Sequence, residues 1–267
     1  MRSPCRTATV LLAAVAGLAL AGCSSDTADD AATSQARATT AAPTLSGDLV
    51  VFAASSLQGT FTEIRDELTA TNPDLEVTLN FGSSGTLIQQ LVAGAPADVY
   101  ASANTQTMHD AAAVVNESQI FSHNSLVIVA PAGNPGEITG LTDFTRAALL
   151  LALCDESAPC GTAARTVFDN AGLTAAPDTY GHDARATLAL VTGGEVDAAM
   201  VYKTDAIAAG DAVETITFPD AASVLNDYLI ATTKDTKNRE AAQAFVDYVM
   251  SAAGQKVLAD AGFEPAS

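Results

Sequence analysis

The sequence predicts an α/β fold with two sheet-forming regions. After Gly47, short runs rich in Val and Leu alternate with segments of helical period, a pattern typical of parallel strands joined by crossover helices. The chain has 267 residues, of which 48% are hydrophobic. This is enough for one large domain or for two smaller lobes with cores of their own.

The predicted elements follow in order along the chain. The first region has strands at 48–54, 75–81 and 98–102, and helices at 57–70, 86–93 and 105–115. The second begins with a strand at 125–131 and continues with strands at 148–154 and 197–202 and helices at 161–171 and 184–192. The last third has a strand around Leu229–Ala231, followed by helices at 238–251 and 252–261.

The N-terminal segment is interpreted as an export signal covering residues 1–22. Two arginines, Arg2 and Arg6, precede an apolar run from Val10 to Ala21 that is short for a membrane span. The run ends in Leu20-Ala21-Gly22-Cys23, which resembles the bacterial lipobox, so we expect Cys23 to be lipidated after cleavage. The alternative is a plain signal peptide with a cysteine there by chance. Residues 23–46 are mostly Ala, Thr, Ser and Asp, a composition that predicts a disordered tether.

The charge of the chain excludes one class of partner. The formal net charge is −19. Removal of residues 1–22 would take away two arginines and leave 10 basic and 31 acidic side chains, for a net charge of −21. A strongly acidic protein is repelled by phosphate backbones, so no nucleic acid is expected as a partner.

Two serine pairs mark a candidate anion site. Ser55-Ser56 and Ser83-Ser84 each end a predicted strand and open a predicted helix. The first N–H groups of a helix lack intrahelical partners and carry the positive end of the helix dipole, so such junctions bind anions. The alternative for each pair is ordinary N-capping. Two similar junctions, a third helix start at Pro159-Cys160-Gly161 and a strand ending in Val201-Tyr202 together favour one shared site.

The chain resembles a known family. Its blocks resemble, in order and spacing, those of the periplasmic molybdate-binding proteins that serve molybdate ABC transporters: VFAASSL, FGSSGTL, GAPADVYASA, NSLVIVAP, PCGTAA, DARATLALV and AAMVY, within Gly47–Phe263. The resemblance implies a two-lobed periplasmic-binding-protein fold of type II. Each lobe would be a mostly parallel sheet flanked by helices, with the cleft between them. Residues 47–126 and 218–267 would form lobe 1, and residues 127–217 lobe 2.

The resemblance also implies the ligand-binding residues, which match this sequence at Ser56, Ser84, Cys160, Ala184 and Tyr202. The hydroxyls of Ser56, Ser84 and Tyr202 would bind the oxyanion, together with backbone amides. Cys160 and Ala184 would contribute backbone N–H groups, a role that does not depend on the side chain. Two alternatives stay open. Arg165 and Arg185 could form an ion pair with the ligand or pair with Asp169 and Asp183 on the surface, and Gly82 and Gly85 could let backbone approach the ligand or be ordinary turn glycines.

The function implied is capture of molybdate or tungstate and delivery to the membrane permease of an ABC transporter. The protein would be an extracytoplasmic, lipid-anchored monomer, without cofactor and without enzymatic activity. A site of donors alone would disfavour hydrogen phosphate, whose O–H would find no acceptor. The alternatives are a binding protein for sulfate or another tetrahedral oxyanion and, from a different class, an exported serine hydrolase, for which no histidine partner is placed near the serines.

The cysteines indicate a disulfide rather than a metal site. Cys154 and Cys160 bracket a seven-residue segment in a chain interpreted as exported, so a bridge between them is expected. His109, His123 and His182 have no ligand spacing that links them to these cysteines. No metal-cation ligands are therefore predicted, and the only metal would be that of the molybdate oxyanion.

Overall fold

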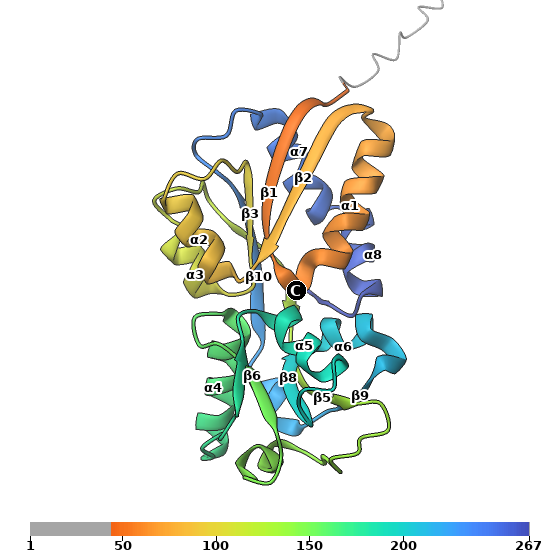
Figure 1. Ribbon diagram of the computed structural model, residues 1–267. Helices are drawn as coiled ribbons and strands as arrows, with labels where there is room; N and C mark the ends of the chain where they lie inside the picture. The colour runs from red at the N-terminus through yellow and green to blue at the C-terminus, as the bar shows by residue number, and fades with distance from the viewer. Residues whose placement is uncertain (1–43, 267) are drawn as a thin grey trace, which may run out of the picture. The chain divides into compact units, whose positions relative to one another are not determined.

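Two sheets organise the structure, a computed structural model that describes residues 44–266 (Figure 1). The predicted signal peptide, Cys23 and the tether up to residue 43 lie outside the described residues. The first sheet has the strand order β11-β4-β10-β3-β1-β2. Its strands are β1 (Ser46–Ala54), β2 (Asp74–Gly82), β3 (Val99–Ser102), β4 (Gln119–Asn124), β10 (Asn226–Thr232) and β11 (Glu264–Pro265).

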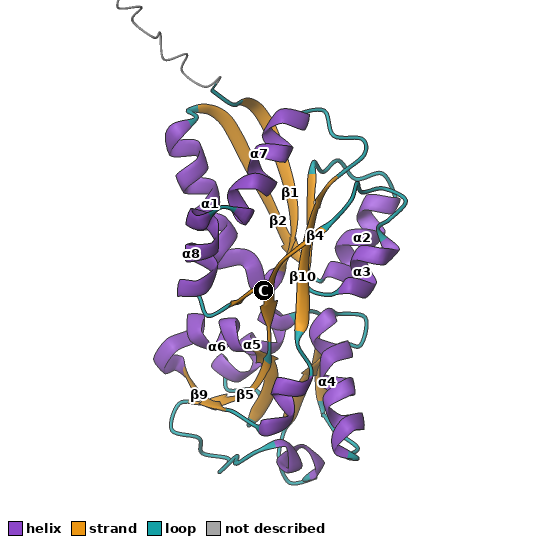
Figure 2. Ribbon diagram, turned by 180° about the vertical axis from the view of Figure 1, so that it is seen from behind, coloured by secondary structure: helices purple, strands orange, loops and turns teal. Residues whose placement is uncertain are grey.

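The second sheet has the order β7-β6-β8-β5-β9. Its strands are β5 (Leu126–Pro131), β6 (Leu151–Cys154), β7 (Thr179–Gly181), β8 (Ala198–Tyr202) and β9 (Val213–Ile216). The chain passes from the first sheet to the second through Ser125 alone, between β4 and β5, and returns between β9 and β10. We call these two crossings between the sheets the hinge region. Each sheet with its helices forms one lobe (Figure 2).

Helices cover both faces of each sheet. The α-helices are α1 (Gln58–Thr71), α2 (Ser84–Val92), α3 (Thr105–Asp110), α4 (Pro159–Ala171), α5 (Ala184–Thr192), α6 (Lys203–Ala209), α7 (Arg239–Met250) and α8 (Ala252–Asp260). Short 3-10 turns are η1 (Ser55–Leu57), η2 (Leu141–Thr145), η3 (Gly210–Ala212) and η4 (Pro219–Ser223). In the first lobe, α1, α7 and α8 lie on one side of the sheet and α2 and α3 on the other (Figures 1 and 2). None of the helices within residues 44–266 is long and apolar enough to cross a membrane.

Apolar spacing explains why these segments bury the faces they do. On α1, Phe61, Ile64 and Leu68 recur at helical spacing and are buried against the first sheet. Phe61 packs on Phe121 of β4 and on Phe245 of α7, with ring centroids 6.0 and 5.4 Å apart. Helix α4 ends at Gly172, whose φ of 65° is the left-handed conformation that glycine adopts at helix ends. The packed core of the first lobe therefore holds the strands in place at whose ends the site lies.

The α/β class predicted from the sequence is confirmed, but the sheets are mixed rather than mostly parallel. Strand β1 pairs parallel with β2 and β3, and β6 pairs parallel with β7 and β8. The remaining pairs, made by β4, β5, β9, β10 and β11 with their neighbours, are antiparallel. The reason is topological: a strand that comes from the other sheet enters in the opposite direction to the strands joined by crossover helices.

Several local differences have physical reasons. Helix α3 ends at Asp110 rather than near 115, because the chain turns to bring Val115 into a bridge with Thr233. Strands β4, β7, β9 and β11 and helix α6 are absent from the sequence prediction. Two of the strands, β7 and β9, are only three and four residues long, which is too short for an alternation of apolar and polar residues to be recognised.

Candidate functional site

All five residues predicted to bind the ligand line one small cavity between the lobes. The space between its walls, open solvent included, is about 190 Å³. Ser56 and Ser84 come from the first lobe, and Cys160, Ala184 and Tyr202 come from the second. All five are buried, with exposed fractions of 8% or less. The structure thus brings together residues that are up to 146 positions apart in the sequence.

The cavity is surrounded by the starts of helices. Strands β1, β2 and β8 end at its wall. After β1 the chain enters η1 and then α1, after β2 it enters α2, and after β8 it enters α6. Helices α4 and α5 also begin at this wall. No side chain caps the N-termini of α2 and α4, whereas α3, α7 and α8 are capped by Asn104, Asn238 and Ser251. Uncapped amide groups at helix starts are available to an anion.

The hydroxyl of Ser84 is held as a donor toward the cavity. The amide N–H of Ala103 donates to Ser84 Oγ at 3.1 Å, and the Tyr100 hydroxyl donates to the Ser84 carbonyl oxygen at 3.0 Å. Since Oγ already accepts a hydrogen bond, the proton of Ser84 remains for another acceptor. Ser84 is fully buried, so bulk water does not supply that acceptor.

Among the further wall residues, Ser83 and Ala103 were not predicted as ligand residues, although Ser83 belongs to one of the two predicted serine pairs. Ser83 lines the cavity and is 4% exposed, and its Oγ has no hydrogen-bond partner among the described residues. It occupies the N-cap position of α2 but does not cap that helix. Ala103 lines the cavity from the segment after β3. The rule that sites form beyond the carboxyl ends of strands was the available signal for Ala103.

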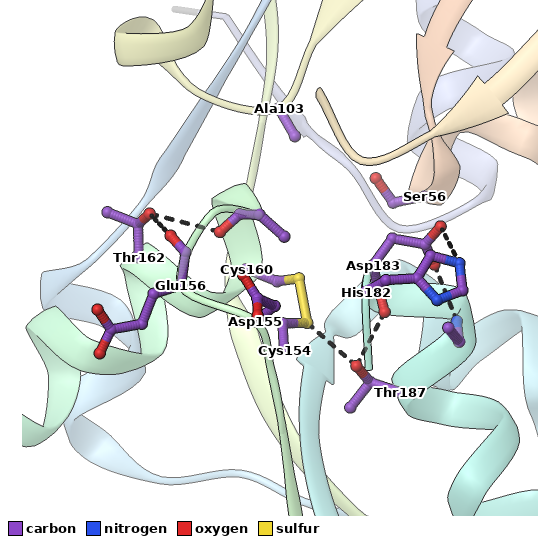
Figure 3. The surroundings of a disulfide bond; sticks show 12 residues. Ser56, Ala103, Cys154, Asp155, Glu156, Cys160, Thr162, His182, Asp183 and Thr187 are labelled. Carbon is purple, nitrogen blue, oxygen red and sulfur yellow. Dashed lines mark hydrogen bonds and ion pairs between the residues drawn. A yellow bond between two sulfur atoms is a disulfide. The ribbon is translucent and has the colours of Figure 1, made fainter. Parts of the chain in front are cut away.

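In the second lobe, a disulfide fixes the turn that starts α4 (Figure 3). Cys154 at the end of β6 is bonded to Cys160, with Cα atoms 5.8 Å apart. The turn is tight: a Cβ on Gly161 would lie 2.1 Å from the Asp155 carbonyl oxygen. The bridge therefore holds the first turn of α4 at the cavity wall, so Cys160 has a structural role besides its predicted amide contact.

The start of α5 is tied to the same disulfide. Thr187 Oγ1 donates to the Asp183 carbonyl oxygen at 2.8 Å and lies 3.3 Å from Cys154 Sγ. Asp183 also lines the cavity, and its Oδ1 accepts from the Ala186 amide at 2.9 Å as the N-cap of α5. This carboxylate is an exception to the predicted wall of donors alone, although one of its oxygens is committed to capping.

Tyr202 presents the other unpaired hydroxyl. It ends β8, is 1% exposed, and its OH has no hydrogen-bond partner in the described structure. Burial raises its pKa well above the usual value, so the hydroxyl keeps its proton and can act only as a neutral donor or acceptor. Its ring packs edge to face on Tyr228, with centroids 5.8 Å apart.

Charged side chains stay out of the cavity apart from Asp183. None of its lining residues is Lys or Arg. Arg165 forms ion pairs with Glu156 at 3.1 Å and with Asp169 at 3.8 Å, and Arg185 is exposed. Behind Tyr202, Asp205 is 1% exposed, and neither of its carboxylate oxygens has a partner within the described part of the chain. Its burial, only partly offset by the charge of Arg185, raises the pKa of this carboxyl to about 7.

Gly85 approaches the other lobe rather than a ligand. A Cβ at this position would lie 2.4 Å from the carbonyl oxygen of Ser157, in the turn before α4. Backbone atoms of the two lobes therefore lie close together next to the cavity. Gly82, by contrast, would meet only the Leu87 side chain at 3.6 Å.

The histidines give no support to catalysis or metal binding by this cavity. His123 pairs with Asp227 at 2.9 Å, while His109 and His182 are exposed and adjacent to Asp110 and Asp183. No described hydrogen bond joins a histidine to a cavity serine. Within residues 44–266, no group of three or more His, Cys, Asp or Glu side chains lies together as a metal site would require.

The chain is similar to proteins of known families. A family model described as bacterial extracellular solute-binding protein matches residues 49–264. Molybdate-binding protein ModA of Mycobacterium tuberculosis is 40% identical over 218 residues, which cover 80% of this chain and 84% of that protein. Molybdate-binding protein ModA of Escherichia coli is 32% identical over 232 residues, which cover 81% of this chain and 89% of that protein.

Two solved structures show the same fold. The periplasmic molybdate-binding protein of Azotobacter vinelandii superposes with a TM-score of 0.72 at 18% identity, covering 82% of this chain and 100% of that chain. The sulfate-binding protein SubI of Mycobacterium tuberculosis gives a TM-score of 0.69 at 18% identity, covering 82% and 87%. At these identities the two likenesses concern the fold alone.

Proposed function

The chain belongs to the family of bacterial extracellular solute-binding proteins, and we propose that it captures molybdate or tungstate for the membrane permease of an ABC transporter. The curated relatives that are at least 30% identical carry the name of molybdate-binding proteins, and they match this chain over most of its length. The proposal includes no catalytic step and no cofactor.

The observation that carries the proposal is a buried cavity with donors that lack acceptors. Ser83 Oγ and Tyr202 OH are buried without partners on opposite lobes, and the helix starts beside them are uncapped on α2 and α4. A buried, unsatisfied hydroxyl costs about 1–3 kcal/mol. A small oxyanion between the lobes would accept from both hydroxyls and from the amides, and so remove that cost.

Neutral donors suffice to hold a dianion in a protein of such negative charge. Hydrogen bonds to a charged group contribute roughly 1.5–3 kcal/mol each. A few of them, less the cost of association, reach micromolar affinity or better. Under this proposal Ser56, Ser84 and Tyr202 donate their hydroxyl protons, Cys160 and Ala184 donate backbone N–H groups, and Ser83 and Ala103 complete the wall.

The same wall would select among tetrahedral anions. Molybdate, tungstate and sulfate are fully deprotonated at neutral pH, whereas hydrogen phosphate brings an O–H that needs an acceptor. Asp183 is the one carboxylate of the wall, and its Oδ1 is already occupied by the Ala186 amide. Sulfate is the second candidate ligand, and the fold shared with a sulfate-binding protein keeps it in the test.

Closure of two lobes on the anion is part of the proposal. We assign residues 47–126 with 218–267 to lobe 1 and residues 127–217 to lobe 2, a division that follows the two sheets except at Leu126, which is the first residue of β5. An anion that touches both lobes binds the closed form better than an open one and shifts the population by that difference in affinity. The protein would act as a monomer outside the cytoplasm, anchored to the membrane through lipid on Cys23.

Thermal unfolding in the presence of four anions tests the function. A ligand that binds the native state raises the melting temperature by mass action. Molybdate and tungstate are expected to raise it at low concentration, and sulfate and phosphate only weakly. Equal shifts from all four anions would contradict the selectivity, and no shift from any of them would remove the proposed function.

A further inference from the structure

A chain of buried hydrogen bonds runs from the hinge to a ligand serine. Asn124 is the last residue of β4, directly before the crossing to the second lobe. Its Nδ2 lies 2.9 Å from Thr204 Oγ1 in α6 and 3.4 Å from the Tyr228 hydroxyl in β10, and that hydroxyl lies 2.8 Å from Ser56 Oγ. All four residues are at most 8% exposed, so bulk water does not compete for these groups.

The orientation of the Asn124 amide gives the chain a direction. The Ser125 backbone N–H donates to Asn124 Oδ1 at 3.0 Å. This contact requires the oxygen of the amide on that side and therefore turns the NH₂ group toward Thr204 and Tyr228. Since an NH₂ group only donates, the Tyr228 hydroxyl accepts a hydrogen bond from Asn124.

Tyr228 must then place its own proton. Burial raises the pKa of this hydroxyl above its usual range, so the proton stays on the oxygen. Ser56 Oγ is the acceptor within reach at 2.8 Å. In the opposite arrangement, Ser56 would donate to Tyr228, so its proton would not be available to an anion in the cavity, and the Tyr228 proton would have to turn toward the neighbouring Tyr202 hydroxyl. With an oxyanion in the cavity to accept from Ser56, the first arrangement gives both hydroxyl protons an acceptor.

We propose that Tyr228, oriented by Asn124, is a positioning residue for the ligand: it donates to Ser56 Oγ and leaves the Ser56 proton free for the bound oxyanion. The inference rests on the proposed function, in which Ser56 is a ligand residue. Ser84 follows the same logic on the other strand end, because its Oγ accepts from the Ala103 amide. Both ligand serines are thereby fixed as donors toward the cavity. Donation by Tyr228 also polarises the Ser56 O–H and strengthens its bond to an anion.

A double-mutant cycle on the full mature protein tests this assignment, with molybdate as the probe in calorimetric titrations. The variants are Tyr228→Phe, Ser56→Ala and the double substitution. Tyr248→Phe is the matched control, since it also removes a hydrogen-bonded tyrosine hydroxyl, on α7 away from the cavity. Melting temperatures without ligand check that each variant is folded.

We expect Ser56→Ala to weaken binding tenfold or more, Tyr228→Phe to weaken it several-fold, and Tyr248→Phe to leave it unchanged. In the Ser56→Ala background, Tyr228→Phe is expected to have no further effect, because its action passes through Ser56. Unchanged or tighter binding by Tyr228→Phe would overturn the assignment, since the reverse arrangement frees the Ser56 proton when the ring loses its hydroxyl.

Two other outcomes would also count against it. An equal loss from Tyr228→Phe in both backgrounds would show a general packing role instead of positioning. Wild-type affinity in Ser56→Ala would remove Ser56 from the ligand set, and with it the role of Tyr228. These results leave molybdate binding by the wild-type protein intact. Failure of the wild-type protein to bind any of the four anions would instead overturn the proposed function and this inference together.

Discussion

Tyr202 and Tyr228 pack edge to face across the two lobes, with ring centroids 5.8 Å apart and planes at 71°, yet only one of the two hydroxyls is paired. The Tyr228 hydroxyl contacts Ser56 and Asn124, while Tyr202 OH is buried without a partner among the described residues. The two tyrosine hydroxyls therefore have different roles. Tyr228 belongs to the internal hydrogen-bond chain, and under the proposed function Tyr202 keeps its donor free for a ligand.

Tyr202→Phe is expected to weaken molybdate binding by about 1.5–3 kcal/mol, the contribution of a hydrogen bond to a charged group. The melting temperature without ligand should be unchanged or slightly higher, because the substitution removes an unsatisfied buried hydroxyl and keeps the ring. Calorimetric titration and thermal unfolding measure the two effects. Ser83→Ala should act in the same direction from the other lobe, and exposed Ser223→Ala serves as its control. Unaltered affinity in Tyr202→Phe would mean that this hydroxyl faces water in solution.

Reduction of the Cys154–Cys160 disulfide is expected to destabilise the protein and to weaken anion binding. The loop that it closes is short, so the entropic model gives about 2 kcal/mol of stability. Binding should fall because the bridge holds the first turn of α4 and, through Thr187, contacts α5. Thiol titration of the denatured protein, with and without reductant, measures the bridge. Two free thiols from this pair in untreated protein would contradict the structure, and full affinity after reduction would remove the link to the site.

Asp205 is expected to make the stability of the fold depend on pH. Burial raises its pKa from 3.8 to about 7, so between these values the native state binds more protons than the unfolded state. The free energy of unfolding should therefore fall as pH rises from about 4 to 7, by up to about 4 kcal/mol from this group. Asp205→Asn should flatten that dependence and raise the melting temperature at pH 8 relative to wild type.

The control for Asp205 is Asp235→Asn, which changes an exposed carboxylate. Thermal unfolding of wild type and both variants at several pH values from 4 to 8 is the measurement. The pH dependence of the control should follow the wild type. A parallel pH dependence in Asp205→Asn would show that the carboxyl of Asp205 ionises in the native state as it does in water.

Gly85→Ala is expected to weaken binding about tenfold by holding the lobes apart. The added Cβ would lie 2.4 Å from the Ser157 carbonyl oxygen, and such overpacking typically costs 1–3 kcal/mol. Unfolding without ligand should change little, because open lobes avoid the contact. Gly59→Ala is the control, since a Cβ there meets no atom within 4 Å. Equal affinity for both variants would show that the contact yields without cost.

The sequence predicted the helix starts better than it predicted the sheets. The family resemblance supplied Ser56, Ser84, Cys160, Ala184 and Tyr202, and each of them lies at a strand end or near a helix start, where local sequence signals are strong. The direction of β4 and β10 depends on the hinge crossing, which no local pattern encodes. The prediction chose one serine of each pair. The free hydroxyl of Ser83 follows from its position at an N-cap where it makes no capping bond, which only the structure shows.

The burial of a charged side chain and the close contact between the lobes also could not be predicted from the sequence. The sequence gives no sign that Asp205 is buried, and its isolation follows from how β8 and α6 pack. The contact between Gly85 and Ser157 joins segments from different lobes. Close approaches of this kind arise from tertiary packing rather than from composition or period.

Isothermal titration of the mature protein with molybdate, followed by competition with tungstate, sulfate and phosphate, tests the central claim most directly. A donor-lined cavity that closes around one oxyanion predicts one molybdate per chain with micromolar or tighter affinity. Tungstate should displace the bound molybdate, while sulfate and phosphate at the same concentration should not. The absence of binding heat with molybdate, or displacement by all three competitors alike, would contradict the account.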